Sequence, residues 1–284
     1  MRRTRIPTVA AALLALAILP SAAEDGALST RSRVDWEART LVVDISLDLA
    51  KAGIRLPAGR LEAERAVERE LPGLSRAALF ALPVDSWRDL GATVADGELD
   101  VNALIDLTSR FRRESAAFSR DLRSFEARYA IPLGEAAALY VRGKEAVPLA
   151  APLGYNPSRA YTGVVIYAEG ELPVRGERAS GRLSPCLFPR IYDEDMVPVL
   201  ERRNVDPAVL ASAGPMGYAR AIDASAEDRV GDDPLRVVAR AVFGTNRTDV
   251  ILSREDATRI LALPENRDLI RRGRVLVVLE LPRL

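Results

Sequence analysis

The sequence predicts a protein of the α+β or α/β class that is built from two domains. Residues 41–49 alternate between apolar and polar side chains, which is typical of a strand with one buried face. Residues 274–280 are almost continuously apolar, which predicts a central strand covered on both faces. Residues 143–158 are rich in proline, show little periodicity and therefore predict a linker. We accordingly place the two domains at residues 34–142 and 159–284.

The first domain is predicted to combine a β-hairpin with long helices. Residues 34–38 and 41–49 form the two arms of the hairpin, and a helix opens at Leu56-Pro57. From residue 101 to residue 129, apolar side chains recur mostly at steps of three, four and seven, which predicts one long amphipathic helix. That helix either packs across the sheet of its own domain or serves as a coiled-coil arm for a partner. The short run of heptads favours the first interpretation.

The second domain is predicted to contain a mixed sheet. Strands are expected at residues 161–168 and 187–192. Residues 235–280 are predicted to form a closing β-β-α-β unit, made of two short strands, a helix and a buried last strand. Ser253, three residues before Asp256, has the spacing of a residue that caps the N-terminus of that helix.

Residues 1–23 have the pattern of a secretory signal peptide. Three arginines precede an apolar run at residues 9–19, and small residues follow at 21–23. The run is shorter than the roughly 20 residues that a membrane span needs. The sequence therefore predicts cleavage after Ala23 and a periplasmic or secreted protein.

Charge and cysteine content exclude several classes of protein. The chain has 40 basic and 40 acidic residues, and without residues 1–23 it has 37 basic and 40 acidic residues. No basic block is present to bind nucleic acid, and no later apolar run is long enough to span a membrane. Cys186 is the only cysteine, so no internal disulfide can form, and we expect it to be a small buried side chain.

The sequence contains no histidine, which removes most of the common catalytic and metal-binding chemistry. Ser-His-Asp and Cys-His catalysis need an imidazole, and nearly all usual zinc sites include one. The sequence also lacks a Walker loop, a Gly-x-Gly-x-x-Gly turn after a strand and a Gly-x-Ser-x-Gly elbow. We therefore predict no cofactor and no metal, and carboxylates remain the only candidates for catalysis.

The densest set of acids, Asp193, Glu194 and Asp195, ends a predicted strand. The simplest interpretation is a solvated turn whose Asp side chains bond neighbouring amides. A loose calcium or ligand site is the main alternative, although calcium loops normally contain a glycine at a fixed spacing. Arg190 precedes these acids, and Tyr161 begins the segment Tyr161-Thr-Gly163 that can shape a pocket, so both join them as candidate binding residues.

Seven short motifs, spread over about the last 125 residues, carry a resemblance to a known family. They are Tyr161-Thr-Gly163, Pro189-Arg-Ile-Tyr-Asp-Glu-Asp195, Gly217-Tyr-Ala219, Arg229-Val-Gly231, Asp233-Pro-Leu235, Asp249-Val-Ile-Leu-Ser253 with Asp256-Ala257, and Gly273-Arg-Val275. The set is similar to bacterial envelope proteins of unknown function that are loosely related to LPP-type twenty-kilodalton outer-membrane lipoproteins and to flagellar-associated periplasmic proteins. This resemblance implies a periplasmic or outer-membrane-facing protein with a part in flagellar or surface assembly and no established catalysis. The chain lacks the lipid-bearing cysteine of many relatives.

These observations favour a non-enzymatic envelope component that binds envelope or flagellar proteins, or itself, through its long helix and strand-end loops. The alternative is a carboxylate-dependent hydrolase of cell-wall glycan, with Asp193, Glu194 or Asp195 as acid or nucleophile. Two carboxylates about 5 to 10 Å apart across a concave cleft would favour the hydrolase. Splayed and exposed acids would favour the binding protein.

Overall fold

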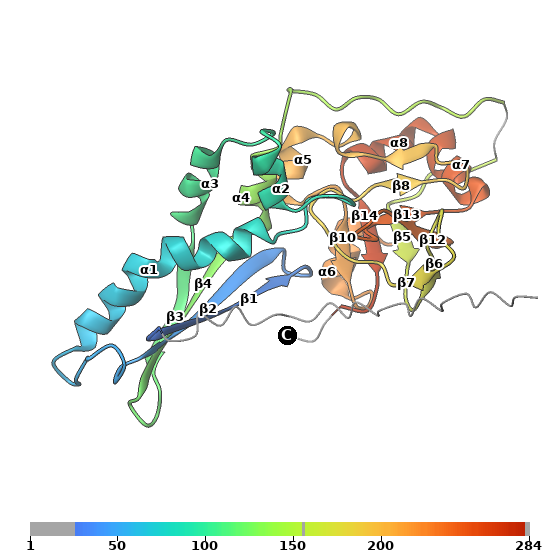
Figure 1. Cartoon of the computed structure of the whole chain (residues 1–284). Coiled ribbons are helices and arrows are strands. Elements are labelled where there is room, and N and C mark those ends of the chain that lie inside the picture. The colour runs from blue at the N-terminus through green and yellow to red at the C-terminus, as the bar shows by residue number, and fades with distance from the viewer. Residues whose placement is uncertain (1–25, 155–156, 282–284) are drawn as a thin grey trace, which may run out of the picture.

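The computed structural model describes residues 26–154 and 157–281. Two domains lie side by side and contact each other, each with its own sheets and helices, which confirms the two-domain α+β class (Figure 1). The predicted signal peptide, residues 1–23, lies outside the described residues. Within the described residues, no helix is both long and apolar enough to cross a membrane.

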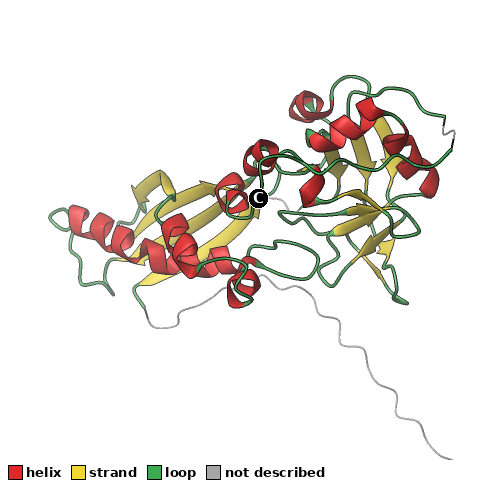
Figure 2. Cartoon of the chain, turned by 90° about the horizontal axis from the view of Figure 1, so that it is seen from above, coloured by secondary structure: helices red, strands yellow, loops and turns green. Residues whose placement is uncertain are grey.

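The first domain is a four-stranded antiparallel sheet with helices on one face (Figure 2). Its spatial order is β1-β2-β4-β3, with β1 (Leu28–Asp35), β2 (Thr40–Asp48), β3 (Arg112–Phe118) and β4 (Ser124–Pro132). The helices are α1 (Arg60–Phe80), α2 (Leu90–Ala95), α3 (Val101–Thr108) and α4 (Leu133–Ala138). Buried side chains alternate along β2 and β4, so the inward residues join the core with α1 and the others form an open face.

The long amphipathic helix predicted for residues 101–129 is wrong. Only Val101–Thr108 is helical, and the chain then forms the β3–β4 hairpin. Phe118 and Phe125 are seven residues apart, a spacing that also suits one face of a helix, but they are cross-strand partners with ring centroids 5.0 Å apart. The turn between them holds Leu122 at a φ of 57°, a conformation foreign to a right-handed helix. This segment therefore provides no coiled-coil arm.

The second domain contains two four-stranded sheets. The first is parallel, in the order β10-β14-β5-β11, with β5 (Val164–Tyr167), β10 (Gly217–Ala219), β11 (Leu235–Val238) and β14 (Val275–Val278). The second is mixed, in the order β12-β13-β8-β9, with β8 (Ile191–Tyr192), β9 (Pro198–Leu200), β12 (Ala241–Phe243) and β13 (Asp249–Ile251). The smaller elements are a hairpin of β6 (Leu172–Pro173) and β7 (Ser180–Gly181), a 3-10 turn η1 (Arg202–Asn204), α5 (Pro207–Ser212), α6 (Ala224–Val230), α7 (Arg254–Ala262) and α8 (Pro264–Arg271).

The closing β-β-α-β unit differs from the prediction in three ways. The first of the two expected strands is two strands, β11 and β12, which belong to different sheets. The single expected helix is two helices, α7 and α8, because Pro264 begins a new helix directly after Leu263. The last strand, β14, joins the parallel sheet and not the sheet of β12 and β13. Ser253 does cap α7, with its Oγ accepting a hydrogen bond from the amide of Asp256 at 3.1 Å. The strand predicted at residues 187–192 is reduced to Ile191–Tyr192.

The turn between β1 and β2, residues 36–39, inserts into the second domain. Trp36 packs edge-on against Tyr218, with ring centroids 5.8 Å apart. The guanidinium of Arg39 lies directly against Gly214, so closely that a Cβ on this glycine would come within 2.4 Å of it. The first predicted hairpin arm is therefore displaced, because the strand ends at Asp35 and residues 36–39 serve the domain interface.

A second contact makes the hydrophobic core continuous between the domains. The amides of Leu187 and Phe188 donate hydrogen bonds to the carbonyls of Pro83 and Val84 at 3.0 and 2.9 Å. The side chains of Leu187 and Phe188 are buried in the core of the first domain. The segment predicted as a linker, 143–158, has neither helix nor strand among its described residues, and the domains are held together by direct packing as well.

Candidate binding groove on the N-terminal sheet

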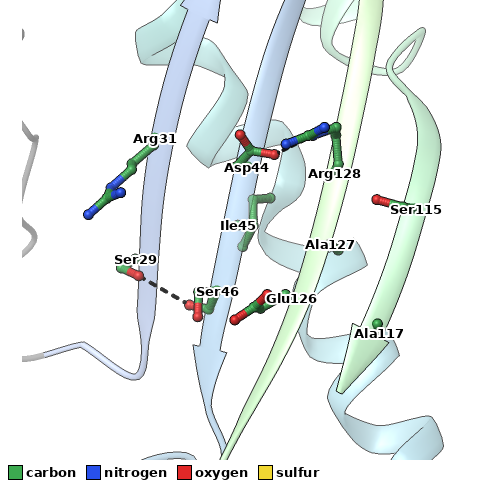
Figure 3. Close-up of a pocket in the computed structure, with 10 residues that line it drawn as sticks. All are labelled: Ser29, Arg31, Asp44, Ile45, Ser46, Ser115, Ala117, Glu126, Ala127 and Arg128. Atoms are coloured by element: carbon green, nitrogen blue, oxygen red, sulfur yellow. Dashed lines mark hydrogen bonds and ion pairs between the residues drawn. The ribbon is translucent and has the colours of Figure 1, made fainter. Parts of the chain in front are cut away.

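A groove lies on the open face of the N-terminal sheet. Its volume is about 570 Å³ and all four strands contribute to its lining (Figure 3). The lining residues are Ser29, Arg31, Asp44, Ile45, Ser46, Ser115, Ala117, Glu126, Ala127 and Arg128. Side chains alternate between the two faces of a strand. Every second residue of β2 and β4 is therefore buried in the core, and the residues between them point into the groove.

The register of the strands arranges eight of these outward residues in two rows across the sheet. One row is Ser29, Ser46, Glu126 and Ala117, and the next is Arg31, Asp44, Arg128 and Ser115. Three of the four members of the first row have short side chains or hydroxyl groups, so the backbone there is accessible to a close neighbour. The second row carries most of the charge.

Asp44 is the electrostatic centre of the second row. The guanidinium of Arg128 donates a hydrogen bond to it at 2.6 Å from Nε, and Arg33 contacts its other carboxylate oxygen. Partial burial raises the pKa of Asp44, but the hydrogen bonds from Arg128 and Arg33 outweigh that effect and lower its pKa below the usual value. Asp44 is therefore ionised and already neutralised near neutral pH, so it is poorly suited to transfer a proton.

Two other charges on this face have no partner of opposite sign. Within the described residues, neither Arg31 on β1 nor Glu126 on β4 forms an ion pair, and both side chains are exposed. Figure 3 shows Arg31 extending past the edge of β1 and Glu126 on the other side of β2. Among the described residues, the groove thus offers a cation and a carboxylate without ion-pair partners and several hydroxyls, which together can hold a polar protein surface by charge-assisted hydrogen bonds.

Comparison with protein families gives two matches in consecutive order. Residues 27–139 match the model for the N-terminal domain of Treponema pallidum Tp0624, and residues 163–281 match the model for its second domain. The chain belongs to a two-domain Tp0624-like family. Comparison with curated protein sequences found no significant match. In this Tp0624-like chain, all the residues that line the groove lie inside the N-terminal match.

The acids predicted as binding residues lie in the second Tp0624-like domain, away from the groove. Asp193 begins the turn between β8 and β9, and its Oδ1 accepts hydrogen bonds from the amides of Asp195 and Val197 at 2.9 and 2.8 Å. The carboxylate of Asp195 is paired with Arg254. This geometry is a turn in which the Asp193 side chain satisfies neighbouring amides. No group of three or more metal-binding side chains gathers in the part of the chain that the structure describes.

The other two predicted residues have separate local roles. Tyr161 lies just before β5, where its hydroxyl accepts a hydrogen bond from Arg259 of α7 at 3.3 Å and Arg159 stacks over its ring. Arg190 lies just before β8 and donates a hydrogen bond to the hydroxyl of Tyr192 at 3.2 Å. Tyr161 therefore contacts α7, whereas Arg190 and the acidic turn lie at opposite ends of β8.

Sequence reasoning missed one carboxyl group with unusual properties, that of Asp249 on β13. Burial raises its pKa to about 6, against hydrogen bonds from Ser86 and from the Arg190 amide that lower it. The residue is only 1% exposed, so substrate in solution has no access to it. Its environment depends on Ser86, which the first domain inserts at the interface and whose Oγ lies 2.8 Å from Thr248 Oγ1. The burial of Asp249 depends on Ser86, which is 163 positions away, so no local sequence pattern could predict it.

Proposed function

We propose that this protein is an exported, non-enzymatic component of the cell envelope that binds a protein partner through the groove on its N-terminal sheet. The observation that carries the proposal is the open face itself, where Arg31 and Glu126, on either side of β2, have no ion-pair partner among the residues that the structure describes. Charged side chains without partners on a rigid sheet are available for contacts with another surface at little conformational cost.

The domain interface supports the same proposal. The β1–β2 turn is held by Trp36 and Arg39 in the second domain, and Leu187 and Phe188 are buried in the first. The sheet is therefore presented in a fixed orientation relative to the second domain. A fixed orientation reduces the entropy lost on binding, which suits an assembly component.

Two features of the sequence support the location and the partner class in this proposal. The pattern of residues 1–23 supports export to the periplasm or beyond, and the resemblance to LPP-type lipoproteins and flagellar-associated proteins supports an envelope or flagellar partner. Export and an envelope or flagellar partner are therefore both part of this proposal.

The groove can be tested by a pair of substitutions on one strand. Ala117 lines the groove, whereas its exposed neighbour Ala116 pairs with Ala127 and does not line it. Ala117→Arg fills the groove and adds a charge, and Ala116→Arg adds the same charge on the same strand. After crosslinking and affinity capture from the periplasm of the source cell, we expect Ala117→Arg to lose a partner, an envelope protein or an untagged copy of this chain. Ala116→Arg should keep that partner.

Two results would overturn the proposal. One is equal recovery of partners, or of none, with the wild-type protein and both variants. The other is cleavage of cell-wall glycan by the purified protein that is lost in Asp193→Ala, because this would establish the carboxylate chemistry of a glycan hydrolase.

A further inference from the structure

We propose that the occupant of the groove is a second copy of this chain, so that two N-terminal sheets pack face to face about a two-fold axis. The inference rests on the proposed function, since it names the partner of the same surface. It begins from the fact that the two unpaired charges of the groove have opposite signs. A surface that must complement itself needs such a pair, because in a two-fold interface each residue of one copy meets the other member of the pair on the second copy.

The strand register places Arg31 and Glu126 on opposite sides of one point on β2. Arg31 on β1 is the cross-strand partner of Asp44, and Glu126 on β4 is the cross-strand partner of Ser46. Asp44 and Ser46 are the outward residues on either side of Ile45 on β2. The point midway between the backbone positions of Arg31 and Glu126 therefore lies over Ile45. A two-fold axis that passes over this point, in the plane between the sheets and perpendicular to the line joining the two residues, brings Arg31 of each copy over Glu126 of the other.

The same operation also matches the remaining charges of the groove. Asp44 and Arg128 occupy neighbouring strands in one row, on either side of this axis, so the same rotation carries Asp44 of one copy toward Arg128 of the other. Each Asp44 is already bonded to Arg128 of its own chain, so the contact would extend an existing network. Positive side chains thus face negative ones across the proposed interface.

Size and side-chain volume are compatible with a weak dimer. Ser29, Ser46, Ser115 and Ala117 are small enough for the sheets to approach closely. Four strands spaced about 4.8 Å apart and about 25 to 30 Å long present roughly 500 Å² per copy, or about 1,000 Å² in total. This lies at the lower limit for specific interfaces, so we expect reversible association at about micromolar or higher concentrations.

Charge reversal provides the test, with the full chain and sedimentation equilibrium as the measurement. Arg31→Glu and Glu126→Arg each replace two attractive contacts of the dimer by two repulsive ones, and each should weaken dimerisation by about tenfold or more. The double variant Arg31→Glu/Glu126→Arg restores both pairs with reversed polarity and should recover most of the wild-type affinity. Arg123→Glu, on the exposed β3–β4 turn outside the groove, is the matched control and should leave the affinity unchanged.

A wild-type protein that stays monomeric, single variants that dimerise normally, or a double variant that fails to recover would each overturn this inference. The dimer and the proposed function can be refuted independently of each other. A monomeric protein whose capture of another envelope protein is lost in Ala117→Arg and kept in Ala116→Arg would refute the dimer and support the groove as a binding site. Capture unaffected by Ala117→Arg, together with a monomeric wild type, would refute both.

Discussion

The antiparallel sheet of the first domain and the parallel sheet of the second domain differ in how many of their faces are covered. In the first domain, α1 covers one face of an antiparallel sheet and the other face is open, so burial alternates along β2. In the second domain, β5 and β14 are buried on both faces. The hydrophobic cluster that includes Ile166 and Val277 packs toward the mixed sheet and α7, and the cluster that includes Val165 packs under α6. The comparison teaches that the antiparallel sheet leaves a whole face available for binding, whereas the parallel sheet has exposed side chains on its edge strand β11.

The largest expected effects come from shortening neighbouring residues on a strand of each sheet. On β5, Val165 and Ile166 are both fully buried, so Ile166→Ala should cost about 2 to 5 kcal/mol of unfolding free energy and Val165→Ala about 2 kcal/mol. On β2, Ile45→Ala should cost about as much as Ile166→Ala, whereas Ser46→Ala should stay within about 0.5 kcal/mol. Urea denaturation of the four variants measures this directly. An equally large loss for Ser46→Ala would show that the open face is covered.

The next effect concerns a buried carboxyl group of the second domain. The folded pKa of Asp249 is about 6, above the ordinary value near 3.8 that applies to the unfolded chain. The folded state therefore binds more protons between these values. The stability linked to this group is fully present below about pH 4 and is lost as pH rises through 6. A shift of about two pKa units corresponds to about 3 kcal/mol at neutral pH.

Asp249→Asn imitates the protonated form and removes this linkage. We expect the variant to be more stable than the wild type at pH 7.5 by up to about 3 kcal/mol, and the difference to shrink toward zero near pH 4. Urea denaturation between pH 4 and 8 measures the difference. Glu145→Gln, at an exposed position between the two domains, is the control and should change stability by less than about 0.5 kcal/mol at any of these pH values. A difference that does not depend on pH would contradict the assignment to Asp249.

The same contrast explains what sequence could predict. Alternation of Val43, Ile45 and Leu47 with polar residues predicted β2 and its wet face, and the continuous apolar run predicted that β14 is covered on both sides. Both patterns are local consequences of burial on one face or two. Two of the groove's lining residues, Asp44 and Ser46 on β2, therefore lay on a face predicted to be solvated.

The part of the groove on β3 and β4 was missed because residues 101–129, which include β3 and most of β4, were interpreted as one helix. Phe118 and Phe125 satisfy a heptad, yet Phe125, Ala127, Tyr129 and Ile131 also alternate with period two, and this is the pattern that the sheet uses. Pairing with β2 decides between the two periods, and pairing is a long-range interaction. Asp249 was missed for a related reason, since Ser86 reaches it only when the domains dock.

The smallest expected effect concerns the carboxylate of the open face. Asp44 has a lowered pKa, so its linkage has the opposite sign to that of Asp249: its stabilisation is present above about pH 4 and is lost as pH falls toward the folded value. Because Asp44, Arg33 and Arg128 are each about a third or more exposed, solvent screens their ion pairs. Asp44→Asn should therefore cost less than about 1 kcal/mol at pH 7.

Salt provides the decisive comparison for Asp44. The cost of Asp44→Asn should fall when sodium chloride is raised from about 0.05 M to about 0.5 M, because the Debye length shortens below about 10 Å. The stabilisation by Asp249→Asn should change much less, since that carboxyl is shielded from solvent ions. Urea denaturation of both variants at the two salt concentrations separates an open face from a closed interface. A cost for Asp44→Asn of several kcal/mol that does not respond to salt would mean that the groove is closed in the isolated protein.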